Sequence, residues 1–258
     1  MVDQSDNTEK SSAALRALSV LETVATSPQP LTATQINQKL KLPKPTMHRL
    51  CQMLEMEGYL QPSLDGRGFR PGNRLSKMAL GVFSNNDYLR AERHAILQRL
   101  SLAVGETCNI SIPDGVEMVY FDRVETHWPL RVQLQINDRV PTYCTASGKL
   151  FLSSLPSAKR NRLVAKLHFQ QRTPNTITDP ERLTAELKRI RRNDIGVDNE
   201  EFMQGMVAVS VPLRNREGQF YGALAIHGPS ARISLERALE QVPKMRAAAS
   251  ELIELLEE

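Results

Sequence analysis

The stretch from Leu31 to Gly72 constrains the fold more than any other part of this chain. It contains Thr32-Ala33-Thr34-Gln35, a capping-box sequence in which the threonine hydroxyl and the glutamine side chain satisfy backbone amides at a helix start. A second helix is predicted from Pro45, which has no N–H to leave unpaired in a first helical turn, to a natural stop at Gly58. The segment therefore predicts two short helices joined by a tight turn.

The second of these helices has one apolar and one polar face. On a helical wheel the apolar face comprises Met47, Leu50, Cys51 and Leu54, and the opposite face comprises Pro45, His48, Arg49 and Gln52. Histidine, arginine and glutamine side chains reach base edges and phosphates when a helix lies in the major groove, while the apolar face holds the helix on its domain. The pattern predicts a DNA-recognition helix.

Two strand-like segments follow this helix, Tyr59–Gln61 and Gly68–Arg70. They flank Asp65-Gly66, and Asp-Gly between two strands is a strong signal for a β-hairpin. The hairpin carries Arg67 and Arg70. Two short helices followed by a basic hairpin are the layout of a winged helix-turn-helix.

The charge of the chain is concentrated in the same segment. Residues 39–74 hold seven lysines and arginines against three acidic residues, and the rest of the chain has 26 of each, so the whole net charge of +4 lies here. Positive charge at this place can neutralise DNA phosphates. A small helical domain with a solvated basic face would explain each feature alone, but the agreement of all of them favours double-stranded DNA as partner.

Length and composition predict a two-domain protein with free thiols. A chain of 258 residues with 41% hydrophobic side chains is long enough for two cores. No apolar run approaches the ~18 residues of a membrane span, and the N-terminal sequence MVDQSD is unlike a signal peptide, so we expect a cytoplasmic protein. The three cysteines, Cys51, Cys108 and Cys144, are far apart and have no Cys-x-x-Cys spacing, so we expect neither a disulfide framework nor a zinc knuckle. We expect no metal site and no cofactor.

The pattern divides the chain into four segments. They are a disordered tail at 1–10, the DNA-binding domain at 11–73, a linker helix at 74–87 and a mixed α/β domain at 88–258. A first helix with Leu15, Leu18, Leu21, Val24 and Ala25 completes a three-helix core in the DNA-binding domain. The fold class is therefore α+β.

The last segment begins with a helix through Leu102 and a meander that predicts an antiparallel sheet. Its strands are expected at Thr107–Ile112, Met118–Val124 and Leu130–Ile136, with Leu130, Val132, Leu134 and Ile136 pointing inward. The later elements are a helix from Ala146, a helix led by Asp179, strands at Met206–Leu213 and Phe220–His227, and a C-terminal helix capped by Ser234 and kinked at Pro243.

Short motifs occur in a fixed order along nearly the whole chain. They are LPKPTMHRL at 42–50, GET at 105–107, TASGK at 145–149, TITD at 176–179, GVDNEE at 196–201, Gly205–Pro212, and GALAIHGP at 222–229. In order and spacing they resemble the motifs of the isocitrate-lyase-regulator (IclR) family of bacterial transcription factors. Two positions depart from the family pattern: Pro45 stands where serine is usual, and Ala208 stands where many members have cysteine.

The resemblance implies a winged helix-turn-helix followed by a GAF-like domain with a six-stranded antiparallel sheet that binds a small metabolite. Family members are dimers that pair into tetramers, and many repress or activate catabolic genes. We therefore expect a homo-oligomer, dimer or tetramer, on a palindromic operator, with repression of a catabolic operon as the commoner mode. The DNA contacts are expected from Lys44, Pro45, Thr46, His48, Arg49, Gln52, Arg67 and Arg70.

The effector pocket is expected at Thr145-Ala146-Ser147-Gly148. This sequence opens a helix, whose free amides and positive dipole end can receive a carboxylate, which favours a small or aromatic organic acid. The resemblance places the other pocket residues at the same cavity, so that the set is Ala146, Ser147, Asp198, Met206, Ala208, Ala225 and His227. Structural roles remain open: Ser147 as a helix cap, His227 as a core histidine and Asp198 as a turn cap.

Two other function classes remain alternatives. Cys144, His227 and Asp198 are the residue types of a Cys-His-Asp hydrolase, although nothing in their spacing requires one. Cys108 and Cys144, with His127 or His168, are the residue types of a metal- or redox-responsive regulator. We do not expect an enzyme, and the lack of clustered ligands in the sequence disfavours the metal- or redox-responsive regulator.

Overall fold

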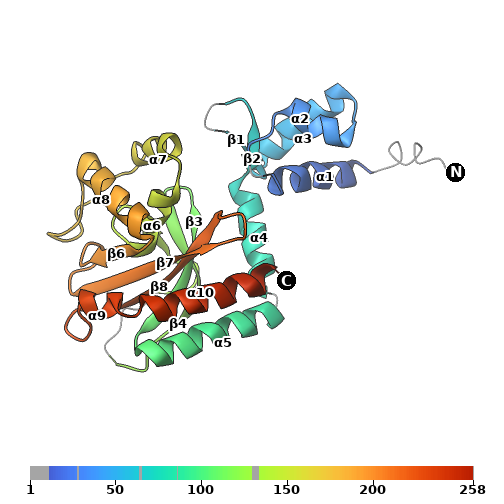
Figure 1. Cartoon of the computed structure of the whole chain (residues 1–258). Coiled ribbons are helices and arrows are strands. Elements are labelled where there is room, and N and C mark those ends of the chain that lie inside the picture. The colour runs from blue at the N-terminus through green and yellow to red at the C-terminus, as the bar shows by residue number, and fades with distance from the viewer. Residues whose placement is uncertain (1–11, 28, 64–65, 86, 130–133, 258) are drawn as a thin grey trace. The chain divides into compact units, whose positions relative to one another are not determined.

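The computed structural model describes residues 12–257, apart from residue 28, residues 64–65, residue 86 and residues 130–133. The expected tail at 1–10 lies outside the described residues. The chain forms two compact units, Met1–Asn85 and Asn86–Glu258 (Figure 1). In the described part of the chain, no helix is long and apolar enough to span a bilayer.

Three helices and a hairpin build the first unit. The helices are α1 (Ala13–Ala25), α2 (Ala33–Leu40) and α3 (Lys44–Met56), the strands are β1 (Leu60–Pro62) and β2 (Phe69–Pro71), and α4 (Asn73–Asn85) follows. The predicted capping box is present, because Gln35 N donates to Thr32 Oγ1 (3.2 Å) and Thr32 N donates to Gln35 Oε1 (2.9 Å). The two central helices and the hairpin are confirmed.

The turn between α2 and α3 is fixed by Asn37 at the end of α2. Its amide nitrogen donates to Leu42 O and its amide oxygen accepts from Leu42 N, both at 2.8 Å. Lys41 adopts a left-handed conformation between them (φ 52°). This local network sets the angle at which α3 leaves α2, and thereby places the polar face of α3.

The core of the first unit uses the apolar face of α3 as predicted. It contains Val20, Leu21 and Val24 from α1, Ile36 from α2, Met47, Leu50, Cys51 and Leu54 from α3, and Leu60 from β1. Leu15 and Leu18 of the predicted α1 pattern are 56% and 55% exposed, so the first turns of α1 contribute no buried leucine. Gly68 N donates to Ser63 Oγ (2.9 Å), and this hydrogen bond joins the two ends of the hairpin loop.

The second unit is built on one antiparallel sheet (Figure 1), whose strand order is β5-β4-β3-β8-β7-β6. Its strands are β3 (Thr107–Asp114), β4 (Glu117–Val124), β5 (Arg139–Pro141), β6 (Gly196–Asn199), β7 (Met206–Arg214) and β8 (Phe220–Pro229). Its helices are α5 (Asp87–Val104), α6 (Ala146–Ser154), α7 (Ser157–Val164), α8 (Pro180–Asn193), α9 (Leu235–Leu239) and α10 (Val242–Glu257). The six-stranded antiparallel sheet and the α+β class are confirmed.

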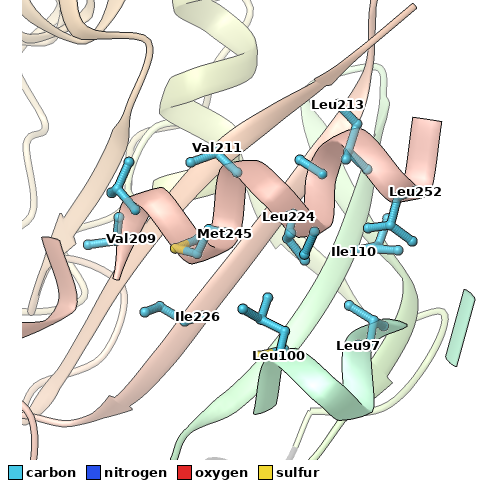
Figure 2. Packing of buried hydrophobic residues seen from close by; sticks show 14 of the residues in the cluster. Leu97, Leu100, Ile110, Val209, Val211, Leu213, Leu224, Ile226, Met245 and Leu252 are labelled. Carbon is cyan, nitrogen blue, oxygen red and sulfur yellow. The ribbon is translucent and has the colours of Figure 1, made fainter. Parts of the chain in front are cut away.

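Strand alternation gives this sheet two chemically different faces. One face packs on α5 and α10 through a cluster that Figure 2 shows from close by: Leu97, Leu100, Ile110, Val209, Val211, Leu213, Leu224, Ile226, Met245 and Leu252. The alternate residues of the same strands are polar or small, as with Asn109, Ser111, Ala208, Ala225 and His227. This polar face lies towards α6 and holds the candidate site.

Helix α6 packs closely on the polar face because two glycines permit it. A Cβ on Gly148 would lie 2.3 Å from Thr142 Cα, and a Cβ on Gly196 would lie 2.2 Å from Ala146 O. Behind α6, Leu150 and Leu152 pack with Leu183, Leu187 and Ile190 of α8 in a second core cluster. Helix α7 was not predicted from the sequence.

Two predicted elements differ from the structure. Residues 130–133 of the expected strand Leu130–Ile136 lie outside the described residues, and 134–136 are not strand. Gln135 N donates to Asp138 Oδ2 (2.6 Å) and Asn137 has φ 74°, so the chain turns here and Ile136 is 44% exposed. The edge strand is β5 instead, and the prediction that Ile136 points inward was wrong.

The predicted kink at Pro243 was also wrong. The segment forms two helices, because α9 ends at Leu239 and α10 begins at Val242. Ser234 caps the first one, accepting from Arg237 N at 3.3 Å. Pro243 therefore stands in the first turn of a new helix, where a missing N–H removes no intrahelical hydrogen bond.

Candidate functional site

The exposed face of α3 is the first candidate site. Pro45, His48, Arg49 and Gln52 are exposed, Lys44 is exposed beside them and Thr46 is half-buried. The opposite face of the helix lies in the core, so these side chains have a fixed platform. In the hairpin Arg67 is exposed, whereas Arg70 is half-buried and donates to Gln61 Oε1 at 3.4 Å. A rigid helix with a polar and basic outer face has the geometry for major-groove contacts.

The second candidate site is a small enclosed cavity in the second unit, between the polar face of the sheet and the start of α6. Its wall includes all seven pocket residues named from the sequence: Ala146, Ser147, Asp198, Met206, Ala208, Ala225 and His227. The structure adds Asn109, Ser111, Tyr120, Val140, Thr145 and Phe202 to the wall. Its volume is about 20 Å³, which is room for about one water molecule.

Asn109 and Ser111 could have been found from the sequence. They alternate with the buried apolar residues Cys108 and Ile110 in β3. Polar side chains at every second position of a buried strand share one face, and that face needs polar partners. Val140 and Phe202 carry no comparable signal, because an apolar residue beside a cavity and one in a core look alike in a sequence.

His227 presents a hydrogen-bond donor to this cavity. Its Nδ1 lies 3.1 Å from Asn109 Nδ2, and because an amide nitrogen can only donate, Nδ1 is the acceptor. Burial, together with the charge of Arg123, lowers the pKa of His227 to about 3, so the ring is neutral. The single ring proton is then on Nε2, which is buried without a hydrogen-bond partner among the described residues.

Two further polar atoms in the cavity wall are also buried without a hydrogen-bond partner among the described residues. They are Asn109 Oδ1 and Ser111 Oγ. Buried polar atoms are nearly always paired, and leaving one unpaired costs about 1–3 kcal/mol. With His227 Nε2, they form a set of donors and acceptors suited to a small polar ligand.

Asp198 combines a cavity position with a structural role. Its Oδ1 accepts from Glu201 N (2.7 Å) and Phe202 N (3.2 Å), so it caps the turn after β6. Burial raises the pKa of Asp198 to about 7, although these backbone donors oppose the shift. Near neutral pH this carboxyl therefore takes up or releases a proton easily.

The start of α6 is capped by Thr145. Its Oγ1 accepts from Gly148 N at 3.2 Å and donates to Pro141 O at 2.7 Å. The possible role of Ser147 as helix cap was therefore wrong, and Ser147 lines the cavity within the first helical turn. The positive end of the helix dipole lies beside the cavity.

A buried lysine ties α6 to the turn that carries Phe202. The Lys149 side chain is 0% exposed, its Nζ contacts Glu201 Oε1, and Glu186 Oε1 on α8 is 3.8 Å away. Thr173 Oγ1 and Thr176 Oγ1 donate to Glu200 O and Glu201 O, both at 2.6 Å. These contacts hold the turn over the cavity.

The geometry does not support a Cys-His-Asp relay. In the sheet, His227 and Asp198 both pair with Ala208, so a whole strand separates them, about 10 Å between backbones. Burial raises the pKa of the Cys144 thiol to about 12 and that of Cys51 to about 11, and it also raises that of Cys108. Among the described residues, no three His, Cys, Asp or Glu side chains gather as a metal site.

Family models match both units of the chain. Residues 13–63 match the IclR helix-turn-helix domain, and residues 83–253 match the C-terminal domain of the bacterial transcriptional regulator IclR. The chain is 42% identical over 241 residues to the probable transcriptional regulator SauR of Cupriavidus necator, covering 93% of this chain and 95% of SauR. It is 29% identical over 218 residues to the regulator XynR of Escherichia coli, covering 84% and 86%.

Solved structures agree with these matches. The IclR protein of Thermotoga maritima has a TM-score of 0.63 and 27% identity, covering 95% of this chain and 98% of its own. An IclR homologue from Microbacterium hydrocarbonoxydans, solved with 4-hydroxybenzoate, has a TM-score of 0.60 and 26% identity, covering 95% and 99%. From the fold of both units and these similarities, we conclude that the chain belongs to the IclR family of bacterial transcriptional regulators.

Proposed function

We propose that this chain is a metabolite-responsive repressor of a catabolic operon, whose affinity for operator DNA changes when a small organic acid occupies the cavity of the second unit. The observation that carries the proposal is the cavity itself. Three buried polar atoms, Asn109 Oδ1, Ser111 Oγ and His227 Nε2, line it without a hydrogen-bond partner among the residues that the structure describes. A polar ligand that paired with them would relieve their desolvation cost and would therefore bind.

The first unit supplies the DNA contacts in this proposal. Lys44, Pro45, Thr46, His48, Arg49 and Gln52 contact base edges and phosphates from α3, and Arg67 and Arg70 contact phosphates or the minor groove from the hairpin. Arg49 is the strongest candidate for reading a base, because it is exposed on the outer face of a helix whose other face is buried. The proposed division of the chain is 11–73 for DNA binding, 74–87 for the linker and 88–258 for the effector.

The cavity favours a small acid over an aromatic one. A volume of about 20 Å³ holds about one water molecule, so any organic acid requires the turn that carries Phe202 to move outward, and an aromatic acid requires the larger movement. Similar structures hold aromatic acids: 4-hydroxybenzoate in the Microbacterium homologue and 3-hydroxybenzoic acid in a mutated PobR inducer-binding domain from Acinetobacter. An acid also suits the positive dipole end of α6.

The proposed regulator is a cytoplasmic homo-oligomer on a palindromic operator. Leu15 and Leu18 of α1 and Met78 of α4 are large apolar side chains that are more than half exposed in the first unit, which suits contact with a second copy. Two recognition helices read half-sites about 34 Å apart, one DNA turn, so a small change at such a contact alters DNA affinity strongly. The effector biases this arrangement through α4.

The test is a gel shift with DNA upstream of the protein's own gene and of the adjacent divergent gene, with excess competitor DNA. It is repeated with a panel of small and aromatic organic acids. Specific binding that one acid weakens or strengthens supports the proposal. Specific binding that no acid changes refutes the effector part, and absence of specific binding at low salt refutes the operator part.

A further inference from the structure

Asn109 and His227 form a hydrogen-bonded pair in the middle of the cavity wall. They lie on β3 and β8, the two central strands of the sheet, each of which is hydrogen-bonded to a strand on either side. His227 pairs in register with Thr107, two residues before Asn109, so the two side chains are diagonal neighbours on one face of the sheet. Asn109 Nδ2 and His227 Nδ1 are 3.1 Å apart, and both residues line the cavity.

The hydrogen bond within this pair leaves one atom of each side chain for a ligand. His227 is neutral, mainly because burial lowers its pKa to about 3, and its Nδ1 accepts from Asn109, so Nε2 carries the ring proton. Nε2 is buried without a hydrogen-bond partner among the described residues, and the same holds for Asn109 Oδ1. The protonated Nε2 can only donate and Oδ1 can only accept.

The pair offers one donor and one acceptor whichever way the amide is turned. If the Asn109 amide were turned by half a turn, its oxygen would accept from His227 Nδ1–H, and Nε2 would carry no proton. The amide nitrogen would then be the free donor and Nε2 the free acceptor. A neutral imidazole bonded to an amide therefore presents the cavity with one of each in both arrangements.

A simple carboxylate can satisfy only half of this pair. An ionised carboxylate accepts hydrogen bonds and has none to donate, so it pairs with the donor and leaves the buried acceptor without a partner. A hydroxyl group on the same ligand supplies the missing donor. Sites that hydrogen-bond a ligand hydroxyl reject analogues without it, because a buried polar atom of the site is then left unpaired.

Ser111, the third cavity residue with an unpaired atom, makes no such demand. Its hydroxyl rotates and can both donate and accept, so it adapts to a carboxylate as well as to a hydroxyl. Asn109 and His227 hold each other in one arrangement. The choice between ligands with and without a donor therefore depends on the pair.

We propose that Asn109 and His227 select hydroxy acids as effectors: the donor of the pair binds a carboxylate oxygen of the ligand, and the acceptor of the pair binds the hydrogen of a ligand hydroxyl group. In the arrangement of the structure, His227 Nε2 takes the carboxylate and Asn109 Oδ1 takes the hydroxyl. The inference rests on the proposed function, because it names the class of acid that the same cavity binds.

The test compares acids that differ only in a hydroxyl group. The probes are glycolate with acetate, lactate with propionate, and 3-hydroxybenzoate with benzoate, each titrated into the full-length protein by calorimetry. The variants are Asn109→Leu, which keeps a branched side chain without polar atoms, and Ser111→Ala. Asn215→Leu is the matched control, because Asn215 is also a buried asparagine of the second unit, but its amide pairs with Gln219 and it does not line the cavity.

In the unaltered protein, at least one hydroxy acid should bind about ten- to a hundredfold more tightly than its counterpart without the hydroxyl, the range for one buried hydrogen bond left unmade. Asn109→Leu should abolish this preference, because no buried acceptor then requires a donor. Ser111→Ala should keep most of it, and Asn215→Leu should keep all of it. The ratio of affinities is taken within each variant, so a loss of folded protein does not imitate the effect.

Three results would overturn the inference. If acids bind but the hydroxyl makes no difference, the pair does not select hydroxy acids, while the organic-acid effector of the proposed function stands. If the preference persists in Asn109→Leu, the pair is not its source, and the proposed function again stands. If none of the six acids binds, the inference and the organic-acid effector fail together.

Discussion

Replacing Lys149 by methionine should destabilise the second unit strongly. The lysine is fully buried, and Glu201, its main partner, has only 8% of its side chain exposed. Methionine fills the same space but leaves the Glu201 carboxylate buried without its cation, and Glu201 Oε2 already lacks a partner among the described residues. Breaking a buried ion pair by removing one partner costs about 3–5 kcal/mol.

The structure also predicts an asymmetry between the two partners. Glu201→Gln should cost less than Lys149→Met, because Glu186 remains 3.8 Å from the ammonium group. The double variant Lys149→Met with Glu201→Gln should recover most of the loss, since no unpaired charge is left buried. Arg189→Gln is the control: it removes an exposed partner of Glu186 and should cost no more than about 1 kcal/mol.

The assay is urea unfolding followed by the fluorescence of Trp128, the single tryptophan of the chain, which lies in the second unit. Circular dichroism on the same samples checks that one transition is being followed. The reasoning is refuted if the double variant is as unstable as Lys149→Met alone. It is equally refuted if Glu201→Gln is the more destabilising of the two single variants.

Three further predictions concern the two candidate sites. Arg49→Ala should weaken operator binding by about 1–3 kcal/mol if Arg49 reads a base, measured by fluorescence anisotropy; an unchanged affinity would remove it from the DNA contacts. The pKa of Asp198 is about 7 in the folded chain against a usual 3.8, so the folded state holds the extra proton and the free energy of unfolding falls as pH rises through this window, by at most about 1.4 kcal/mol per pH unit. Asp198→Asn should flatten that slope in urea titrations between pH 5 and 7, and an unchanged slope would contradict the assignment. Thr32→Ala should lower the stability of the first unit by about 1 kcal/mol through loss of the capping box, and no change in its thermal transition would count against that role.

Local signals in the sequence predicted the first unit well. The capping box at Thr32 and Gln35 and the two faces of α3 depend on residues a few positions apart, and the structure has both. Prediction was weaker where contacts between residues far apart in the sequence decide which segment forms a strand. The alternation at Leu134 and Ile136 suited a strand, but the turn held by Asp138 ended it, and the edge strand formed at Arg139–Pro141.

The cavity was only partly predictable. The helix start at Ala146 and Ser147 follows from local sequence, whereas Asp198, Ala208 and His227 were placed there by the family resemblance. Its volume was not predictable, because Ala208 and Ala225 alone suggest open space. The room that they leave depends on how closely α6 and Phe202 approach, which is a property of the packed unit.

The two faces of the sheet also bear on how such a regulator can change during evolution. Val207 and Val209 belong to the core, while Ala208 between them belongs to the cavity wall, and Leu224 and Ile226 flank Ala225 in the same way. If the cavity binds the effector as proposed, ligand preference and folding stability depend on alternate residues of the same strands. Substitutions at the cavity-lining positions can therefore change the effector while the core positions keep the fold intact.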